Sequence, residues 1–463
     1  MKRADLKRLP RGQLIDRILA LQTRNEQLET RVADLQAQLR KPAKTPANSS
    51  VPPAHGYKPQ RKRPADGPRK RGPKHGHRGT TRLPSVPNVR IVARVEQCAH
   101  CGHELGTLEQ AVVARRQVVD LPPIQPLVVE AQVCRVVCPG CGQRHQAAFP
   151  EGFRAPQSFG PAVQALVPYL HEVHHVPYGR LAQVLGEVCG LQISAGSLVN
   201  LVRRTGNALN PTAEAIRREV IQSQVIASDE TGARVDGTNQ WQWVFRTSQA
   251  SYYVIVPSRG SQVIRDVLGE AQPDVWISDL WSAQQKAPAA QFQLCHAHQL
   301  RDLEFAKDCG DQRFAPAMQA LLRRSEKLAR ARGKLPPTEF EAKAQQIHRQ
   351  CDALLAEHAA HPEGRKLQRR YRRHRDKLFV FLERPDVPYD NNGSERDLRN
   401  SVIHRKVTGG FRSEWAPQIF ATITTVIETA KKRGQGVLET LVMGIGRALP
   451  VEALPIRVHG PAP

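Results

Sequence analysis

The chain has 463 residues, and its 68 Lys and Arg outnumber its 43 Asp and Glu, which gives a formal net charge of +25. A surplus of this size favours polyanionic partners, of which nucleic acid is the usual one. No apolar run reaches the roughly 18 residues of a membrane-spanning helix, and nine unevenly spaced Cys argue against a disulfide scaffold. The N-terminal residues lack the apolar segment of a secretory signal, so we expect a cytoplasmic protein of about three domains.

Residues 1–40 carry a heptad repeat. Leu14, Leu21, Leu28 and Leu35 occupy the d positions, and Ile18, Asn25, Val32 and Leu39 occupy the a positions. Leu at d, β-branched residues at two a positions and one polar Asn favour a parallel two-stranded coil. We therefore predict a leucine-zipper-like coiled coil that makes a homodimer or higher oligomer. The alternative is one amphipathic helix packed on its own chain, but a long polar stretch follows it.

Residues 41–90 contain ten Pro and no apolar periodicity, which is typical of a linker. Its basic run favours contact with DNA phosphates without sequence readout, and a solvated spacer is the alternative. The candidate DNA-binding residues are Arg61, Lys62, Arg63, Arg69, Lys70, Arg71, Lys74 and Arg78.

Two CxxC pairs predict a zinc-ribbon-like module over residues 91–150. Cys98 with Cys101, and Cys138 with Cys141, match four thiolate ligands of structural Zn²⁺. Cys134 lies outside both pairs and is expected to pack. We expect strands at 115–120 and 127–131 between the pairs. Four Cys that serve only as buried apolar residues would seldom fall into this pattern.

Residues 151–215 form a small helical domain in this interpretation. A helix over 178–188 is followed by Gly190, and Ser194 is placed to cap a second helix that ends near Arg203 and Arg204. A DNA-binding helix-turn-helix with these two arginines as contacts and an ordinary helical hairpin fit equally well.

From residue 216 to residue 435 the pattern changes to strands and helices. Apolar runs at 225–227, 241–245, 252–256, 275–277 and 292–294 predict five strands, with a helix around 263–268. This is the element order of an RNase H-like mixed sheet. An Arg-, Lys-, Ala- and Leu-rich helical insertion fills about 300–388, and residues 436–463 add a C-terminal helix and a tail.

Three acids stand at the ends of these elements. Asp229 follows the first strand, Asp279 follows the fourth, and Glu395 begins a helix after the insertion. Two divalent metal ions need several oxygen donors that converge from separate elements, and such a pair can drive an in-line displacement at phosphorus. A single Asp at a strand end is usually a solvated surface residue, but three in this context favour a metal site.

Four runs together resemble the insertion sequence 66 (IS-66) family of bacterial transposases. They are Ser228-Asp229-Glu230-Thr231-Gly232, Ser278-Asp279-Leu280-Trp281-Ser282, Cys295-His296-Ala297-His298-Gln299-Leu300-Arg301 and Asn391-Asn392-Gly393-Ser394-Glu395-Arg396-Asp397-Leu398-Arg399. The zipper-like helix, the CxxC module and the run Arg405-Lys406-Val407-Thr408-Gly409-Gly410 are similar to that family's layout, so the resemblance covers nearly the whole chain.

The resemblance implies a DDE transposase with Asp229, Asp279 and Glu395 as catalytic ligands of two Mg²⁺ or Mn²⁺ ions. Glu230 is the rival of Asp229, because adjacent residues of a strand point to opposite faces and only one can enter the site. Further DNA contacts are expected from His298, Arg301, Arg396 and Arg399.

The expected activity is cleavage of the element's DNA ends and their joining to target DNA. A DNA-binding regulator with an inactive transposase fold and a structure-specific nuclease are the alternatives. The resemblance also implies accessory proteins encoded by the same element.

Overall fold

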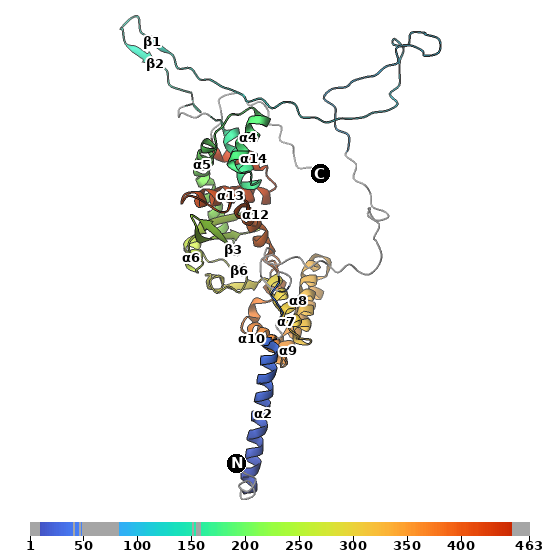
Figure 1. Ribbon diagram of the computed structural model, residues 1–463, viewed down its shortest axis with the longest axis vertical. Helices are drawn as coiled ribbons and strands as arrows, with labels where there is room; N and C mark the ends of the chain where they lie inside the picture. The colour runs from blue at the N-terminus through green and yellow to red at the C-terminus, as the bar shows by residue number, and fades with distance from the viewer. Residues whose placement is uncertain are drawn as a thin grey trace.

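A five-stranded mixed sheet lies at the centre of the computed structural model, which describes residues 10–39, 42–45, 48, 83–150, 152–153 and 159–446 (Figure 1). Its strands are β3 (Val225–Val235), β4 (Thr238–Arg246), β5 (Ser251–Val256), β6 (Val275–Ser278) and β7 (Gln291–Leu294). The spatial order is β5-β4-β3-β6-β7, with β3, β4 and β5 antiparallel and β6 and β7 parallel to β3. All five strands lie where the sequence predicts them.

Strand β3 is longer than expected, and Asp229 lies inside it rather than after it. The parallel pairing with β6 stops at Ala227, but β3 continues to Val235 as one arm of a hairpin with β4. The hairpin turns at Asp236 and Gly237, whose φ angles of 44° and 74° are those of a type I′ turn. Asp229 therefore lies just beyond the point where β6 separates from β3.

Helices cover both faces of the sheet. On one face, Trp243 and Phe245 pack in a core with α5 (Ala195–Ile221) and α6 (Gln262–Leu268). On the opposite face, Val244 and Tyr253 pack with α12 (Asn392–Thr408) and α13 (Ala416–Lys432). Alternate side chains of β4 therefore point into one core or the other. Because β3 pairs with β4, the face to which each β3 side chain points can be read from its partner on β4.

The helical insertion forms a separate lobe at the β6–β7 end of the sheet (Figure 1). Its helices are α7 (His296–Asp308), α8 (Phe314–Arg330), α9 (Pro337–Ala356), α10 (Pro362–Arg373) and α11 (Val380–Glu383), with short 3₁₀ turns at Arg332–Lys334 and Arg375–Lys377. Apolar side chains of the insertion share one core with β6 and β7, so the lobe and the sheet are packed together.

The predicted small helical domain contains α3 (Pro161–Pro168), the π-helix η2 (Tyr169–Val173), α4 (Tyr178–Cys189) and α5. Ser194 caps α5 as expected, since its hydroxyl accepts a hydrogen bond from the Ser197 amide at 3.2 Å. The expectation that this helix ends near Arg203 and Arg204 is wrong. It continues to Ile221, because its buried stripe extends to Val220 and packs on α13. The C-terminal helix α14 (Val437–Ile445) packs beside it, and the predicted tail from 447 lies outside the described residues.

The predicted zinc module has one short hairpin, β1 (Arg135–Val137) with β2 (Arg144–Gln146), around the second CxxC pair. The strands expected at 115–120 and 127–131 are absent from these described segments. Pro122, Pro123 and Pro126 lie between and beside them, and proline cannot donate to a strand ladder, which explains why neither segment finds a partner.

The heptad segment forms one helix, α2 (Arg11–Leu39), that projects from the insertion lobe in Figure 1. Its apolar stripe is open to solvent, as Ile18, Leu21, Leu28, Val32 and Leu35 are about half exposed. The alternative of a helix packed on its own chain therefore finds no support along the described part of this stripe. Among the described residues, no helix is long and apolar enough to cross a membrane.

Candidate active site

The sheet register places Asp229 and Glu230 on opposite faces. Asp229 pairs with Val244, and Glu230 pairs with Trp243. Directly paired residues of an antiparallel ladder point to the same face. Asp229 is consequently on the face covered by α12, the helix that carries Glu395, while Glu230 is on the face of α5 and α6.

Glu230 is fully engaged on its own face. Arg259 binds its carboxylate through Nε at 2.9 Å and Nη2 at 2.8 Å, and Gln284 donates to its other oxygen at 2.8 Å. The guanidinium of Arg259 is itself sandwiched between the rings of Trp241 and Trp281, at 4.4 and 4.0 Å from their centroids. These contacts indicate that Glu230 holds the loop of Arg259 in place, on the face opposite to Asp229.

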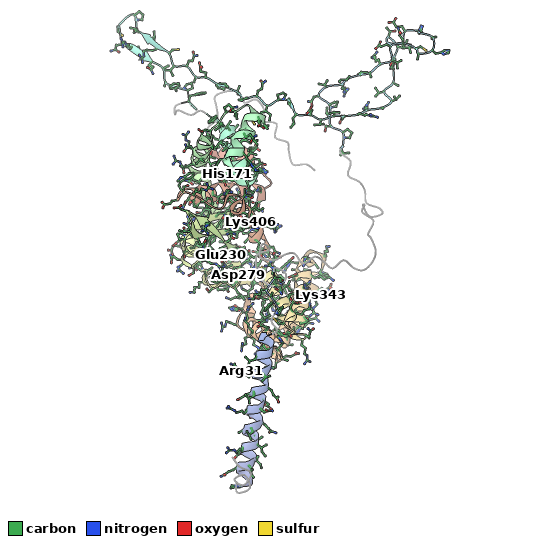
Figure 2. All side chains as sticks on the ribbon, in the orientation of Figure 1. Arg31, His171, Glu230, Asp279, Lys343 and Lys406 are labelled. Atoms are coloured by element: carbon green, nitrogen blue, oxygen red, sulfur yellow. The ribbon has the colours of Figure 1, made fainter. Side chains whose placement is uncertain are left out.

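Asp279 follows β6 directly and turns back on its own loop. Its Oδ1 accepts a hydrogen bond from the Trp281 amide at 2.8 Å, which fixes the side chain at the C-terminal end of β6. Figure 2 shows Asp279 and Glu230 at the same level of the molecule, at the junction of sheet and insertion lobe. Asp279 is half-buried.

Contacts at the start of α12 bring Glu395 to the same edge. The Asn391 side chain donates to the Ser228 carbonyl at 2.8 Å, one residue before Asp229, and the Asn391 amide donates to the Cys295 sulfur at 3.1 Å. Ser394 then donates to the Asn391 side chain at 2.6 Å. The Asn-Asn-Gly-Ser-Glu run thus ties the first turn of α12 to β3 and to the end of β7.

The electrostatics show that the three acids share one environment. Burial raises the pKa of Asp229 well above its usual value, and the charges of Glu230, Asp279 and Glu395 raise it further. In the described part of the chain, the three carboxylates are too far apart for one oxygen from each to lie within 4.8 Å of the other two. Mutually repelling carboxylates of this kind fit a divalent cation, which neutralises them when it binds.

Two basic residues of α7 occupy the space beside Glu395. Arg301 Nη2 lies 3.3 and 3.4 Å from the two carboxylate oxygens of Glu395, and His298 Nε2 lies 3.7 Å from one of them. Burial lowers the pKa of His298, an effect that Arg301 strengthens and that Glu395 and Asp279 oppose. These two predicted DNA contacts therefore lie beside the acid cluster itself. Arg301 supplies a positive charge next to Glu395, whereas the lowered pKa of His298 favours its neutral imidazole.

Arg396 and Arg399 are exposed on α12 next to Glu395. Arg399 follows Glu395 by one helical turn and so lies on the same side of the helix. Arg203 and Arg204, the other described candidates, are exposed on α5, where Arg203 lies over the Trp415 ring at 5.7 Å. The eight candidates between Arg61 and Arg78 lie outside the described residues.

Sequence reasoning missed the anchor that positions α12. Asp397 is buried and binds Arg246 at 3.1 Å, Lys432 at 2.8 Å and the Ser251 hydroxyl at 2.6 Å. The Arg246 guanidinium occupies the space that a Cβ on Gly393 would need, which gives a packing reason for that glycine. The only sequence signal was an acidic residue in the middle of a basic helix.

The two CxxC pairs form nearly identical turns. In each, the first Cys accepts a backbone bond from the Gly that follows the pair, Gly102 or Gly142, at 2.9 Å, with that Gly at φ 74° or 70°. Backbone amides aimed at sulfur lower the pKa of Cys98 and of Cys138. Each half is therefore preformed for a metal thiolate.

The two halves are not joined in the described structure. The segment of the first pair and the β1–β2 hairpin lie on opposite sides of the molecule in Figure 1, and the four sulfurs do not form a group within 4.8 Å. Cys134 is exposed beside the hairpin. The turns fit a Cys₄ zinc site that a bound ion would complete by drawing them together.

The family model of the transposase IS66 family matches residues 157–419, which is more than half of the chain. This protein belongs to that family. A second model, the zinc-finger binding domain of transposase IS66, matches residues 96–142 and supports structural zinc in this IS66 family member. The first match contains Asp229, Asp279 and Glu395, and the second contains all four Cys of the CxxC pairs.

One curated relative is also similar over a short stretch. A protein of Sinorhizobium fredii, described as "Uncharacterized protein y4jO", is 42% identical to this chain over 69 residues. The stretch covers 15% of this chain and 22% of that relative's length.

Proposed function

We propose that this IS66 family member is a DDE transposase with an RNase H-like catalytic core. It would cleave the DNA ends of its insertion sequence and join them to target DNA by two-metal-ion transesterification. The observation that supports the proposal is that the charges of Asp279, which follows β6, and Glu395, on α12, both act on the buried Asp229 of the neighbouring strand β3. The sheet order β5-β4-β3-β6-β7 supports the proposed core.

Each of the three acids has a separate role in this proposal. Asp229 is the residue of its pair that faces α12, so it is the proposed ligand, and Glu230 instead positions Arg259. Two divalent ions, Mg²⁺ or Mn²⁺, would activate first water and then the freed 3′-OH, and would stabilise the leaving 3′ oxygen. Glu395 would exchange its contact with Arg301 for the metal.

The basic residues around the site support a nucleic-acid substrate. Arg399 and Arg396 present exposed guanidinium groups beside Glu395, and Arg301 would bind a phosphate once Glu395 has left it. We further propose that the linker arginines and lysines and the CxxC module contact DNA, and that Arg203 and Arg204 join them. The open stripe of α2 would pair with a second copy and hold two DNA ends together.

The test is end cleavage and joining on a duplex that carries the flanking repeats, with Mg²⁺ or Mn²⁺. Wild type is compared with Asp279→Asn, which keeps the side-chain shape but removes the charge that binds metal. Metal-dependent nicking and joining by wild type, both lost in the variant, support the proposal.

The other outcomes assign other functions. Nicking without joining would identify a structure-specific nuclease. DNA binding without cleavage, even with the element's accessory proteins added, would identify a regulator with an inactive transposase fold.

A further inference from the structure

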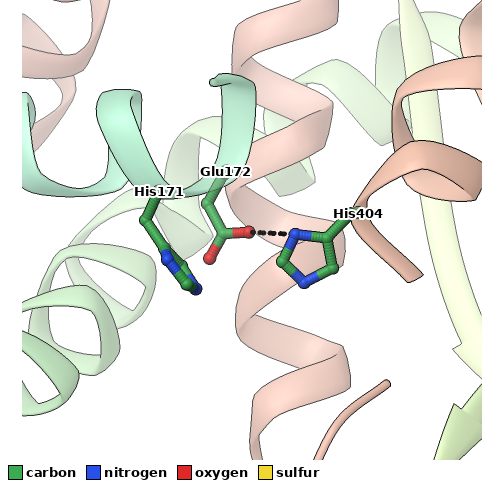
Figure 3. Close-up of side chains that lie close together, drawn as sticks. All are labelled: His171, Glu172 and His404. Carbon is green, nitrogen blue, oxygen red and sulfur yellow. Dashed lines mark ion pairs between the residues drawn. The ribbon is translucent and has the colours of Figure 1, made fainter. Parts of the chain in front are cut away.

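A second cluster of metal-ligand side chains lies away from both proposed metal sites. His171 and Glu172 are on the π-helix η2. His404 is on α12, nine residues after Glu395. All three side chains are buried, with 6%, 4% and 4% of their surface exposed. One ligand atom from each lies within 4.8 Å of the other two. Figure 3 shows the three side chains pointing toward one another.

The polar atoms that face this space are left without hydrogen bonds. Glu172 Oε2 and His404 Nδ1 are both buried and unpartnered, although they lie 3.7 Å apart. Among the described residues no Lys or Arg pairs with Glu172, so no fixed positive charge balances its carboxylate. Burial alone raises the pKa of Glu172 to about 8. The ionised form is disfavoured because no cation lies beside it, and a bound metal ion would stabilise that form.

His171 is already oriented as a ligand. Its Nδ1 lies 2.8 Å from the Val176 carbonyl, which can only accept, so Nδ1 carries the proton and Nε2 keeps its free lone pair. A metal-binding histidine typically donates its other ring N–H to such a carbonyl. The Tyr178 ring stacks on the imidazole with centroids 3.9 Å apart, which fixes the ring plane.

The backbone around the cluster is also unusual. Single turns of π-helix inside helical segments are rare and occur often at functional sites, and η2 places His171 and Glu172 side by side toward α12. His175, two residues after the end of η2, has φ of +55°, and its buried Nδ1 has no hydrogen-bond partner. Its ring centroid lies 5.8 Å from that of His404, so it is a candidate for a further ligand.

We propose that His171, Glu172 and His404 bind a structural Zn²⁺ ion, with His175 or a water molecule as the fourth ligand. Two nitrogen donors and one carboxylate suit Zn²⁺, whose bonds to these atoms are about 2.0–2.2 Å long. Closing the site requires the side chains to move inward by roughly an ångström from their present separations. The ion would clamp η2 of the small helical domain to the helix that carries Glu395.

The test is a zinc count on the purified full-length chain by elemental mass spectrometry. The proposal expects one ion more per chain than the CxxC module holds. Glu172→Gln, which keeps the side-chain volume, and His404→Ala should each remove that extra ion. His374→Ala, a histidine remote from the cluster, is the matched control and should retain it.

Cobalt substitution separates this site from the thiolates. In Cys98→Ser/Cys101→Ser/Cys138→Ser/Cys141→Ser, a bound Co²⁺ should show visible d–d bands without sulfur-to-cobalt charge transfer, and adding His404→Ala should abolish them. Chelation should lower the unfolding temperature of this four-Cys variant but not that of the variant that also carries His404→Ala. A zinc count unchanged by Glu172→Gln and His404→Ala, in variants whose circular dichroism is native, would overturn the proposal. Its failure would leave the DNA-cleavage proposal unaffected, because no readout is catalytic.

Discussion

At the scale of single residues, strand register places two neighbouring acids, Asp229 and Glu230, on opposite faces of the sheet. Asp229 faces α12 and shares its environment with Asp279 and Glu395, whereas Glu230 binds Arg259 on the other face. A motif of adjacent acids cannot reveal this difference, because strand register is needed to assign each residue to a face.

The different positions of Asp229 and Glu230 give the first prediction. Asp229→Asn should reduce metal-dependent DNA cleavage by more than the roughly 10- to 100-fold that is typical for residues that only orient ligands. Glu230→Gln keeps one acceptor oxygen, so it retains the hydrogen bond from either Arg259 or Gln284 and loses the other. Because Glu230 acts only through Arg259 in this assignment, the reduction in cleavage by this variant should fall within that range. Initial cleavage rates at saturating Mn²⁺ measure both, and equal losses in the two variants would contradict the assignment.

Lys432 gives a prediction for the dependence of stability on pH. Burial lowers its pKa from 10.5 to about 8, although Asp397 opposes the shift. Between about pH 8 and pH 10.5 the unfolded chain therefore binds more protons than the folded chain, and stability rises with pH across this window. Relative to Lys432→Met, the wild type should gain up to about 3 kcal/mol of unfolding free energy. Denaturant titrations of both proteins at the two ends of the window measure the difference.

At the scale of elements, the start of α12 depends on the absence of one side chain. A Cβ on Gly393 would clash with Arg246 Nη1, so Gly393→Ala must displace the guanidinium that pairs with Asp397. We expect a loss of about 1–3 kcal/mol in unfolding free energy and a further loss of cleavage activity.

Gly196→Ala is the matched control for this substitution. It lies in α5 with nothing within 4 Å of the added Cβ, so it should be neutral or stabilising by up to about 1 kcal/mol. Thermal or denaturant unfolding compares the two variants, and equal stability of both would show that Arg246 adapts without cost.

The helix α2 gives a prediction about assembly. Leu21→Glu/Leu28→Glu places charges on the open apolar stripe and should convert a homodimer or higher oligomer into a monomer. Gln27→Glu, a charge on the opposite side of the same helix, should leave assembly unchanged. Sedimentation velocity measures the oligomeric state of the wild type and of both variants. A wild type that is already monomeric would contradict the proposed coiled coil.

The elements also show how far the sequence alone reaches. Apolar runs located all five strands, and the Ser194 cap located the start of α5, since both patterns are local. The length of α5, the hairpin that encloses Asp229 and the missing strands at 115–120 and 127–131 depended on partners distant in the chain. Asp397 and the His171–Glu172–His404 cluster were missed for the same reason.

At the scale of the whole molecule, the basic residues predict how binding responds to salt. If the linker neutralises phosphates, Arg61→Ala/Lys62→Ala/Arg63→Ala should weaken DNA binding equally for element ends and unrelated DNA. The slope of log K against log salt should shrink by up to about 3, roughly one for each phosphate that is no longer neutralised. Fluorescence anisotropy at several salt concentrations measures both values. A selective loss for element ends would assign these residues to sequence readout instead.

The contact of Arg301 with Glu395 means that the acid cluster carries its own counter-ion. A guanidinium from the neighbouring lobe offsets the repulsion among the carboxylates. In the proposed mechanism, Glu395 would leave Arg301 on binding a metal ion, and the freed guanidinium would then neutralise a DNA phosphate. The same positive charge would stabilise the site first without and then with the metal ion, so that metal binding and DNA binding would be coupled.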